Sequence, residues 1–140
     1  MKSTVAPGLV FVRRLTVDAG RTIDFMGDEG RVYSTPALVR DIELACRENL
    51  LEHLDAGEDS VGIRIELDHI APTLLAMPVE IRASVIEVKG RLVTFEIAAR
   101  DPVDEIARGK HVRFVVDVRK TAERLKAKAA KAAAGGSPMP

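Results

Sequence analysis

The fold is decided by a long helix that the sequence predicts at residues 35–54, TPALVRDIELACRENLLEHL. Thr35 is a favourable N-cap residue, and Pro36 occupies the first helical position, where its missing N–H is not needed. Apolar residues spread over more than one narrow stripe of this helix, which indicates that other structure covers it on several sides. The turn-forming residues 55–59, DAGED, end it.

Strands are predicted on both sides of the helix. Residues 8–18 are rich in β-branched and aromatic types, and after the helix the apolar period changes to two, which predicts strands at 60–70, 78–88, 91–100 and 104–118. Lys89-Gly90 and residues 101–104, DPVD, are tight links between neighbours. One strand, one helix and a four-strand antiparallel meander predict an α+β fold with the helix laid on one face of the sheet.

The strand at 60–70 brings a titratable ring to an apolar face. The residues that share this face are Val61, Ile63, Ile65, Leu67 and His69. A histidine at the edge of an apolar surface is either a packing residue or an acid/base group. In the last strand, Arg108 and Lys110 interrupt the apolar alternation, and this mixed register predicts a β-bulge around Gly109.

The composition is that of one globular domain, with 21 basic and 21 acidic residues among 140. No apolar run is long enough to cross a membrane, and the N-terminus lacks the apolar block of a secretion signal, so we expect a cytoplasmic protein without a membrane partner. We expect residues 1–118 to form the domain. Residues 119–140, with six basic residues and one acidic residue, are expected to form a basic helix and flexible tail, either solvated or in contact with phosphate groups.

Several kinds of site are excluded by the motifs that the sequence lacks. The histidines at 53, 69 and 111 have no metal-ligand spacing, and no phosphate-binding loop or nucleophile elbow is present. Scarce aromatic residues argue against a nucleic-acid partner. We therefore expect no metal, no cofactor and no nucleic acid, and we expect Cys46 to be a small buried hydrophobic residue.

Two residues of the long helix are candidates for chemistry. Glu43 either pairs with Arg47, four residues later, or faces a cavity as a desolvated carboxylate, whereas Asp41, Glu48 and Glu52 are expected to be solvated. Thr35 is either an N-cap or a catalytic hydroxyl at the positive end of the helix. Because Pro36 has no N–H, any oxyanion donors there would come from Ala37 and Leu38.

The predicted sheet leaves its edges and part of its surface uncovered by a single helix. Self-association is the simplest way to protect them, and a symmetric dimer is the commonest form. We therefore expect a homodimer or a higher homo-oligomer.

Because of five residues and this order of elements, the chain resembles the hotdog-fold thioesterases similar to fluoroacetyl-CoA thioesterase. The five residues are Thr35, Glu43, Gly62, His69 and Arg113. The resemblance covers roughly residues 9–118. Three pieces of sequence carry it. The first is Thr35 followed eight residues later by Glu43, within IELAC (42–46). The others are VGI (61–63) with DHIA (68–71), and VDEI (103–106) continuing through GKHVR (109–113).

The resemblance implies a hotdog fold, an antiparallel sheet of about five strands wrapped on one long central helix. It also implies hydrolysis of a short acyl-CoA thioester in a cleft at a dimer interface, with coenzyme A as part of the substrate. The implied catalytic residues are Thr35, Glu43 and His69, and the implied substrate-binding residues are Gly62, Ala37 and Arg113. The alternative is a non-catalytic hotdog module that binds an acyl-CoA or a protein partner.

The resemblance leaves the mechanism and the acyl group open. Thr35 would either form an acyl-enzyme or position water, and Arg113 would contact a CoA phosphate or pair with an acid such as Glu43. The family tends to have glycine where this chain has Pro36, and a Thr-Pro-x-Gly turn where it has PTLL (72–75). Only Phe25 stands where an aromatic gate is expected, within residues 25–30. We therefore expect no selectivity for fluoroacetyl, and either a broader range of small acyl groups or a different small acyl group.

Overall fold

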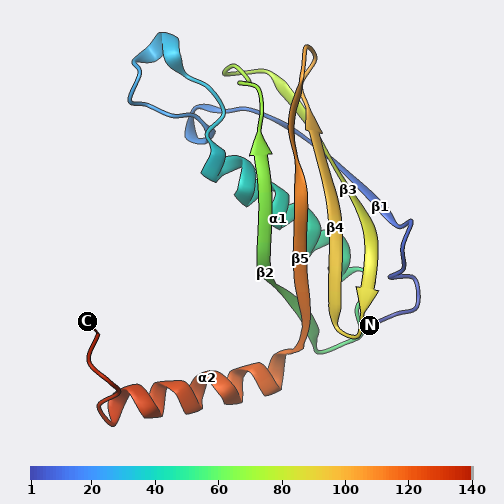
Figure 1. Cartoon of the computed structure of the whole chain (residues 1–140), viewed down its shortest axis with the longest axis vertical. Coiled ribbons are helices and arrows are strands. Elements are labelled where there is room, and N and C mark those ends of the chain that lie inside the picture. Colours follow the sequence, from blue (N-terminus) through green and yellow to red (C-terminus); the bar gives the residue numbers. More distant parts are fainter. Residues whose placement is uncertain (140) are drawn as a thin grey trace.

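The computed structural model describes residues 1–139 and places five strands and two α-helices along them (Figure 1). The elements are β1 (Val10–Thr16), α1 (Thr35–Leu51), β2 (Glu58–His69), β3 (Pro78–Lys89), β4 (Leu92–Arg100), β5 (Glu105–Asp117) and α2 (Val118–Ala133). Two short 3₁₀ turns, Ala19–Arg21 and Asp28–Gly30, lie between β1 and α1. The predicted α+β class and the order of its elements are confirmed.

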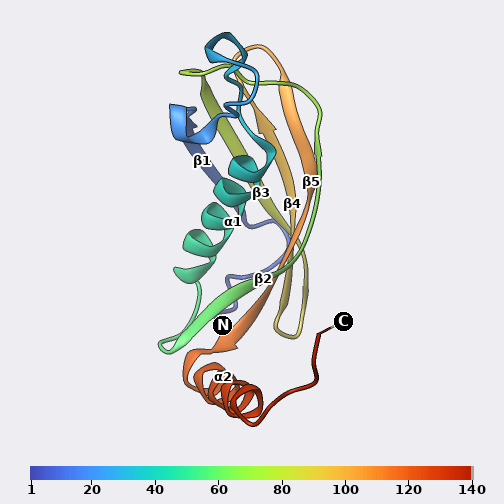
Figure 2. The same cartoon turned by 90° about the vertical axis from the view of Figure 1, so that its left-hand side faces the viewer.

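The strands form one antiparallel sheet in the order β1-β3-β4-β5-β2. The predicted meander holds for β3, β4 and β5, but the expectation that all four later strands form a meander is wrong, because β2 pairs with β5 and not with β3. The reason is the position of α1, which crosses the concave face of the sheet between its two edges (Figures 1 and 2). The strands before and after α1 therefore lie on opposite edges.

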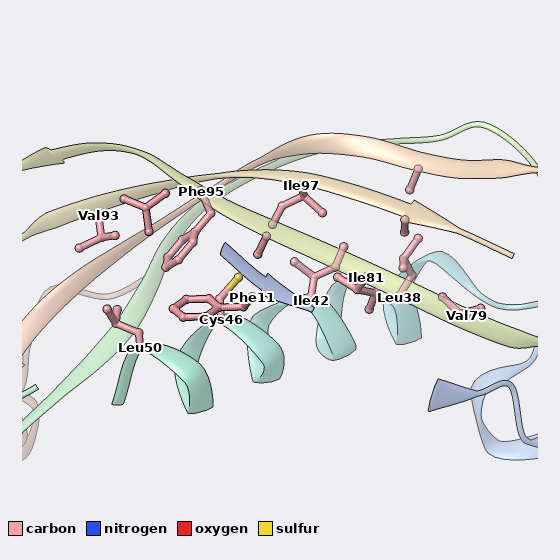
Figure 3. Packing of buried hydrophobic residues seen from close by; sticks show 14 of the residues in the cluster. Phe11, Leu38, Ile42, Cys46, Leu50, Val79, Ile81, Val93, Phe95 and Ile97 are labelled. Carbon is pink, nitrogen blue, oxygen red and sulfur yellow. The ribbon is translucent and has the colours of Figure 1, made fainter. Parts of the chain in front are cut away.

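The main core lies between α1 and the concave face of the sheet (Figure 3). The buried residues of the helix follow one stripe at helical spacing: Leu38, Asp41, Ile42, Ala45, Cys46 and Leu50. The sheet meets this stripe with apolar residues of β3 and β4, among them Ile81, Phe95 and Ile97. The prediction for Cys46 is confirmed, and burial raises the pKa of its thiol to about 12. The remaining sides of α1 are half-buried or exposed in the single chain, contrary to the expected cover on several sides.

A β-bulge is present, but in β2 and not at Gly109. The register between β2 and β5 shifts between Gly62 and Arg64, while Gly109 pairs regularly with Leu67. Gly109 is needed for another reason, because a Cβ there would lie 1.8 Å from the carbonyl oxygen of Glu66. Because two backbones approach closely here, any larger residue would force one of them to shift.

The bulge changes which side chains face the helix, because one extra residue moves every later side chain to the other face. Ile65 and Leu67 pack against the core after the bulge, whereas Val61 and Ile63 are 45% and 56% exposed. The prediction that one face runs from Val61 to His69 is therefore wrong at its first two positions. In β5 the inward residues after the mixed segment are His111, Arg113 and Val115, not the apolar residues at 112, 114 and 116.

The chain ends in α2, which extends beyond the end of the sheet (Figures 1 and 2). Asp117 caps it by accepting a hydrogen bond from the backbone N–H of Lys120. None of its residues is buried. Among residues 1–139, no helix is both long and apolar enough to span a membrane.

Candidate active site

The hydroxyl of Thr35 lies beside the ring of His69 where α1 begins and β2 ends. Ser34, not Thr35, is the N-cap residue, and its hydroxyl accepts a hydrogen bond from the backbone N–H of Ala37. This leaves the Thr35 side chain free of the capping role that the sequence predicted. Its Oγ1 is 2.8 Å from Nδ1 of His69. Within the single chain the fold thus brings together two of the three predicted catalytic residues.

The His69 ring is held in a partly buried place and is incompletely hydrogen-bonded. Burial lowers the pKa of His69, so the ring is neutral at neutral pH and one nitrogen carries the proton. Its Nε2 is buried and has no hydrogen-bond partner among residues 1–139. A neutral imidazole beside a hydroxyl is an arrangement suited to a general base and its nucleophile.

An open pocket of about 300 Å³ adjoins this pair. Most of its other lining residues are apolar and come from the segment before α1 and the turn after β2: Ile23, Val32, Tyr33, Ser34, Ile70, Ala71 and Pro72. The exposed Phe25 is not among them. The pair therefore lies at a small, open depression that its polar groups share with apolar side chains.

Behind His69 lies a buried network that the sequence analysis missed. The rings of Tyr33 and His69 are nearly perpendicular, with their centroids 6.4 Å apart. The Tyr33 hydroxyl donates to Asp41, which is 6% exposed and also accepts from Nε of Arg21 at 2.9 Å. The expectation that Asp41 is solvated is wrong. Burial, together with the hydrogen bond to Asp41, raises the pKa of Tyr33, which keeps the phenol protonated.

Glu43 lies two helical turns beyond Thr35, about 12 Å along the axis, and it faces Gly62 of β2. A Cβ at position 62 would lie only 2.4 Å from Oε1 of Glu43, so the absent side chain makes room for the carboxylate. Of the two alternatives for Glu43, the pairing with Arg47 does not form, because Arg47 instead binds Asp59 at 2.7 Å. Among the described residues, Glu43 makes no hydrogen bond or ion pair.

Arg113 of β5 lies beneath Gly62 and is 4% exposed. It donates from Nε to Oγ of Ser60 at 2.7 Å, from Nη2 to the carbonyl of Ser60 at 2.8 Å, and from Nη1 to Nε2 of His111 at 3.1 Å. Burial lowers the pKa of Arg113. His111 was not among the predicted site residues. Its signal in the sequence was its position two residues before Arg113, which puts both on one face of a strand.

The predicted site residues therefore form two groups in one protomer. Thr35 and His69 make the first, at the start of α1, and Glu43, Gly62 and Arg113 make the second, further along the same helix. Ala37 lies near the first group but lines a different pocket, and its N–H is taken by Ser34. No cluster of three metal-ligating side chains occurs within residues 1–139.

Comparisons with known proteins agree with the fold and with the catalytic class. The family model for the fluoroacetyl-CoA-specific thioesterase FlK matches residues 17–119. A fluoroacetyl-CoA thioesterase from Streptantibioticus cattleyicolor is 30% identical over 127 residues, which are 86% of this chain and 91% of the relative. The family model and this relative therefore both match most of the chain.

Two solved structures extend the agreement to the backbone. A phenylalanine-to-alanine variant of FlK in complex with fluoroacetate and CoA is 29% identical, has a TM-score of 0.76, and is matched over 83% of this chain and 98% of that one. A Thermus thermophilus protein of the thioesterase superfamily is 25% identical, has a TM-score of 0.83, and is matched over 93% and 97% of the two chains. The predicted hotdog fold is thus confirmed. The chain belongs to the fluoroacetyl-CoA-specific thioesterase family and is a thioester hydrolase.

Proposed function

We propose that this protein hydrolyses short acyl-CoA thioesters, with Thr35, Glu43 and His69 as its catalytic residues. The observation that carries the proposal is the hydrogen-bonded pair of Thr35 and His69, with Nε2 of His69 lacking a partner, beside a pocket of about 300 Å³. A pocket of this size lies at the lower end of the range for ligand sites, which suits a small acyl group. The related FlK variant was solved with fluoroacetate and CoA, and those are the two products of hydrolysing its thioester.

In the first step, the thioester carbonyl is attacked by the Thr35 hydroxyl or by a water molecule that Thr35 orients. His69, neutral because burial lowers its pKa, accepts the proton of the attacking group. The resulting imidazolium then returns a proton to the leaving thiolate of CoA as the tetrahedral intermediate collapses. Attack by water releases the acid directly, whereas attack by Thr35 leaves its ester, which water then hydrolyses as His69 again accepts and returns a proton. The positive end of the α1 dipole stabilises the oxyanion that forms in between.

Glu43 enters the reaction, we propose, through a homodimer. It lies about 12 Å from Thr35 along α1, so one protomer by itself does not assemble the three residues. A symmetric partner gives each cleft a Thr35–His69 pair from one chain and a Glu43 group from the other. The proposal is supported by the edge strand β2, because its exposed apolar residues Val61 and Ile63 would be buried at a dimer interface.

The substrate-binding residues are proposed to act at different depths. Gly62 makes room for the Glu43 carboxylate beside the substrate, and Ala37, which lines a neighbouring pocket at the start of α1, is proposed to contact a more distant part of the substrate. Arg113 is buried and acts on the site through its charge rather than by contact with a CoA phosphate. Because Phe25 is 78% exposed and outside the pocket, we propose that the enzyme is not selective for fluoroacetyl and takes a broader range of small acyl groups or a different one.

The test is an assay of free CoA thiol across saturated acyl-CoAs of increasing chain length, with fluoroacetyl-CoA included. We expect the highest kcat/KM with the shortest chains. Glu43→Ala and His69→Ala should each reduce it at least 100-fold, while Glu48→Ala, an exposed glutamate on the same helix, should not change it. Equal rates for the wild type and the first two variants would refute the assignment. Binding of acyl-CoA without hydrolysis would favour the non-catalytic module.

A further inference from the structure

The guanidinium of Arg113 is buried without a carboxylate bound to it. Its hydrogen bonds go to Ser60, twice, and to His111, and none goes to an acid. A buried charge is tolerated only when its donors are satisfied and an opposite charge lies near. Ser60 and His111 meet the first condition, since each holds a different part of the guanidinium. The second condition, a nearby opposite charge, must be met by the nearest acidic side chain.

His111 is fixed in one tautomer by its two partners. Its Nδ1 lies 2.8 Å from the carbonyl oxygen of Arg64, which can only accept, so Nδ1 carries the proton. Its Nε2 is therefore a lone-pair acceptor for Nη1 of Arg113. Arg64 is the residue at which register resumes after the bulge in β2. The bulge that opens space at Gly62 is thus directly followed by the carbonyl that orients His111.

Glu43 and Arg113 point at the same place but do not bond. The position that a Cβ of Gly62 would occupy is 2.4 Å from Oε1 of Glu43 and 3.4 Å from Nη1 of Arg113. Even so, no ion pair between these two side chains exists in the described part of the chain. The carboxylate therefore lies against Gly62 with the guanidinium nearby but not bonded to it.

We propose that His111 is a positioning residue, which holds Nη1 of Arg113 and so keeps the Glu43 carboxylate out of a direct ion pair. A carboxylate captured by a guanidinium would be both displaced from the cleft and a weaker proton acceptor. Ser60 is the second part of this clamp, because it accepts from Nε and Nη2 of the same guanidinium. The inference rests on the proposed function, since it assumes that Glu43 acts on the substrate.

The decisive variant is His111→Phe. It removes both hydrogen bonds but keeps a ring to stack on Phe95, whose centroid is 6.4 Å from that of His111. We expect kcat to fall about 10-fold with KM within twofold, because the catalytic carboxylate is captured while the binding pocket at Thr35 is unaltered. His111→Gln, whose amide can both donate and accept, should restore most of kcat.

The matched control is His53→Phe. His53 also packs against a phenylalanine ring, that of Phe11, and hydrogen-bonds to Thr4, but it lies beyond the other end of α1. Its replacement should lower thermal stability without changing kcat or KM. If His111→Phe does not fold, Ser60→Ala loosens the same guanidinium and should lower kcat in the same way.

A crystal structure of His111→Phe, or of Ser60→Ala, supplies a readout that does not depend on activity. We expect a carboxylate oxygen of Glu43 within 3.2 Å of a guanidinium nitrogen of Arg113, namely Nη1 in the His111 variant, where the wild type has no such bond. A folded variant with Glu43 unmoved, or with wild-type kcat, would overturn the inference. If the wild type hydrolyses no thioester, the proposed function fails, whereas the crystal structure still decides whether His111 holds the two side chains apart.

Discussion

Oγ1 of Thr35 and Nδ1 of His69 are hydrogen-bonded at 2.8 Å, although 34 residues separate them in the chain. The bond joins the first residue of α1 to the last residue of β2. Ser34 makes it possible, because it supplies the cap for the helix and leaves the threonine hydroxyl unused. Structural and chemical roles at the helix start are thus divided between two adjacent hydroxyls.

This division predicts opposite outcomes for two alanine substitutions. Thr35→Ala should reduce kcat at least 100-fold through loss of the hydroxyl, with a stability change within about 0.5 kcal/mol. Ser34→Ala should instead lower the free energy of unfolding by about 1 kcal/mol through loss of the cap. Thr35→Ser keeps the hydroxyl and should keep kcat within about 10-fold. Steady-state kinetics and urea unfolding measure both quantities, and an active Thr35→Ala enzyme would contradict the role of the hydroxyl.

Gly62→Ala should damage activity more than stability. Its Cβ would meet Oε1 of Glu43, the mobile end of a side chain, so the carboxylate moves aside and the backbone does not. We expect kcat to fall about 10-fold and the free energy of unfolding to fall by less than about 1 kcal/mol. Gly109→Ala is the comparison, because its Cβ would meet the backbone of Glu66 and should cost roughly 3 kcal/mol. Equal stability losses in the two variants would refute this distinction.

The two glycines also illustrate how far the sequence could predict the structure. Alternating apolar residues placed every strand within about two residues, and Thr35 with Pro36 marked the helix start. The charged residues on both sides of Gly109 predict a bulge there. It lies instead at residues 62–64, where the alternation of apolar types is unbroken. The exposed Ile63 satisfied the pattern of a buried face without belonging to one.

Long-range partners were the second limit of prediction. His111 and Asp41 are polar residues at positions whose burial depends on elements far away in the chain, so composition suggested solvent for Asp41 and no role for His111. Spacing held partial information, because Asp41 falls on the same helical stripe as Leu38 and Ile42. The tyrosine and arginine that satisfy Asp41 come from the irregular segment before α1, where no periodicity applies.

The buried histidines predict how stability depends on pH. Burial lowers the pKa values of His111 and His69 below those of the unfolded chain, so below about pH 6.5 the unfolded state binds protons first. The free energy of unfolding should therefore fall as pH decreases through this range and level off below the folded pKa values. Each pKa unit between the folded and unfolded states of a histidine contributes about 1.4 kcal/mol to this change in the free energy of unfolding. Urea unfolding at pH 7.5 and 5.5 should show a smaller decrease for His111→Gln than for the wild type, and an equal decrease would contradict it.

The network behind His69 predicts different losses of stability for substitutions at Tyr33 and at Asp41. Tyr33→Phe removes one hydrogen bond but leaves Asp41 paired with Arg21, and it should lower the free energy of unfolding by about 1.5 kcal/mol. Asp41→Leu leaves the buried Tyr33 hydroxyl without an acceptor and the guanidinium of Arg21 without this acid. It should cost roughly twice as much. Urea unfolding at neutral pH compares them, and the reverse order would show that Asp41 is not the acceptor that the network needs.

Ile63→Lys tests whether the active site is shared between two chains. Ile63 is 56% exposed in the edge strand β2, and a lysine on a strand edge opposes pairing with another strand. We expect a dimer for the wild type and a monomer for the variant in analytical ultracentrifugation, with protomer stability within about 0.5 kcal/mol. Because Glu43 and the Thr35–His69 pair are then held apart, kcat/KM should fall at least 10-fold. Val103→Lys, at an exposed turn between β4 and β5, should remain dimeric and active. A monomeric Ile63→Lys enzyme with full activity would place all the chemistry within one protomer and remove Glu43 from it.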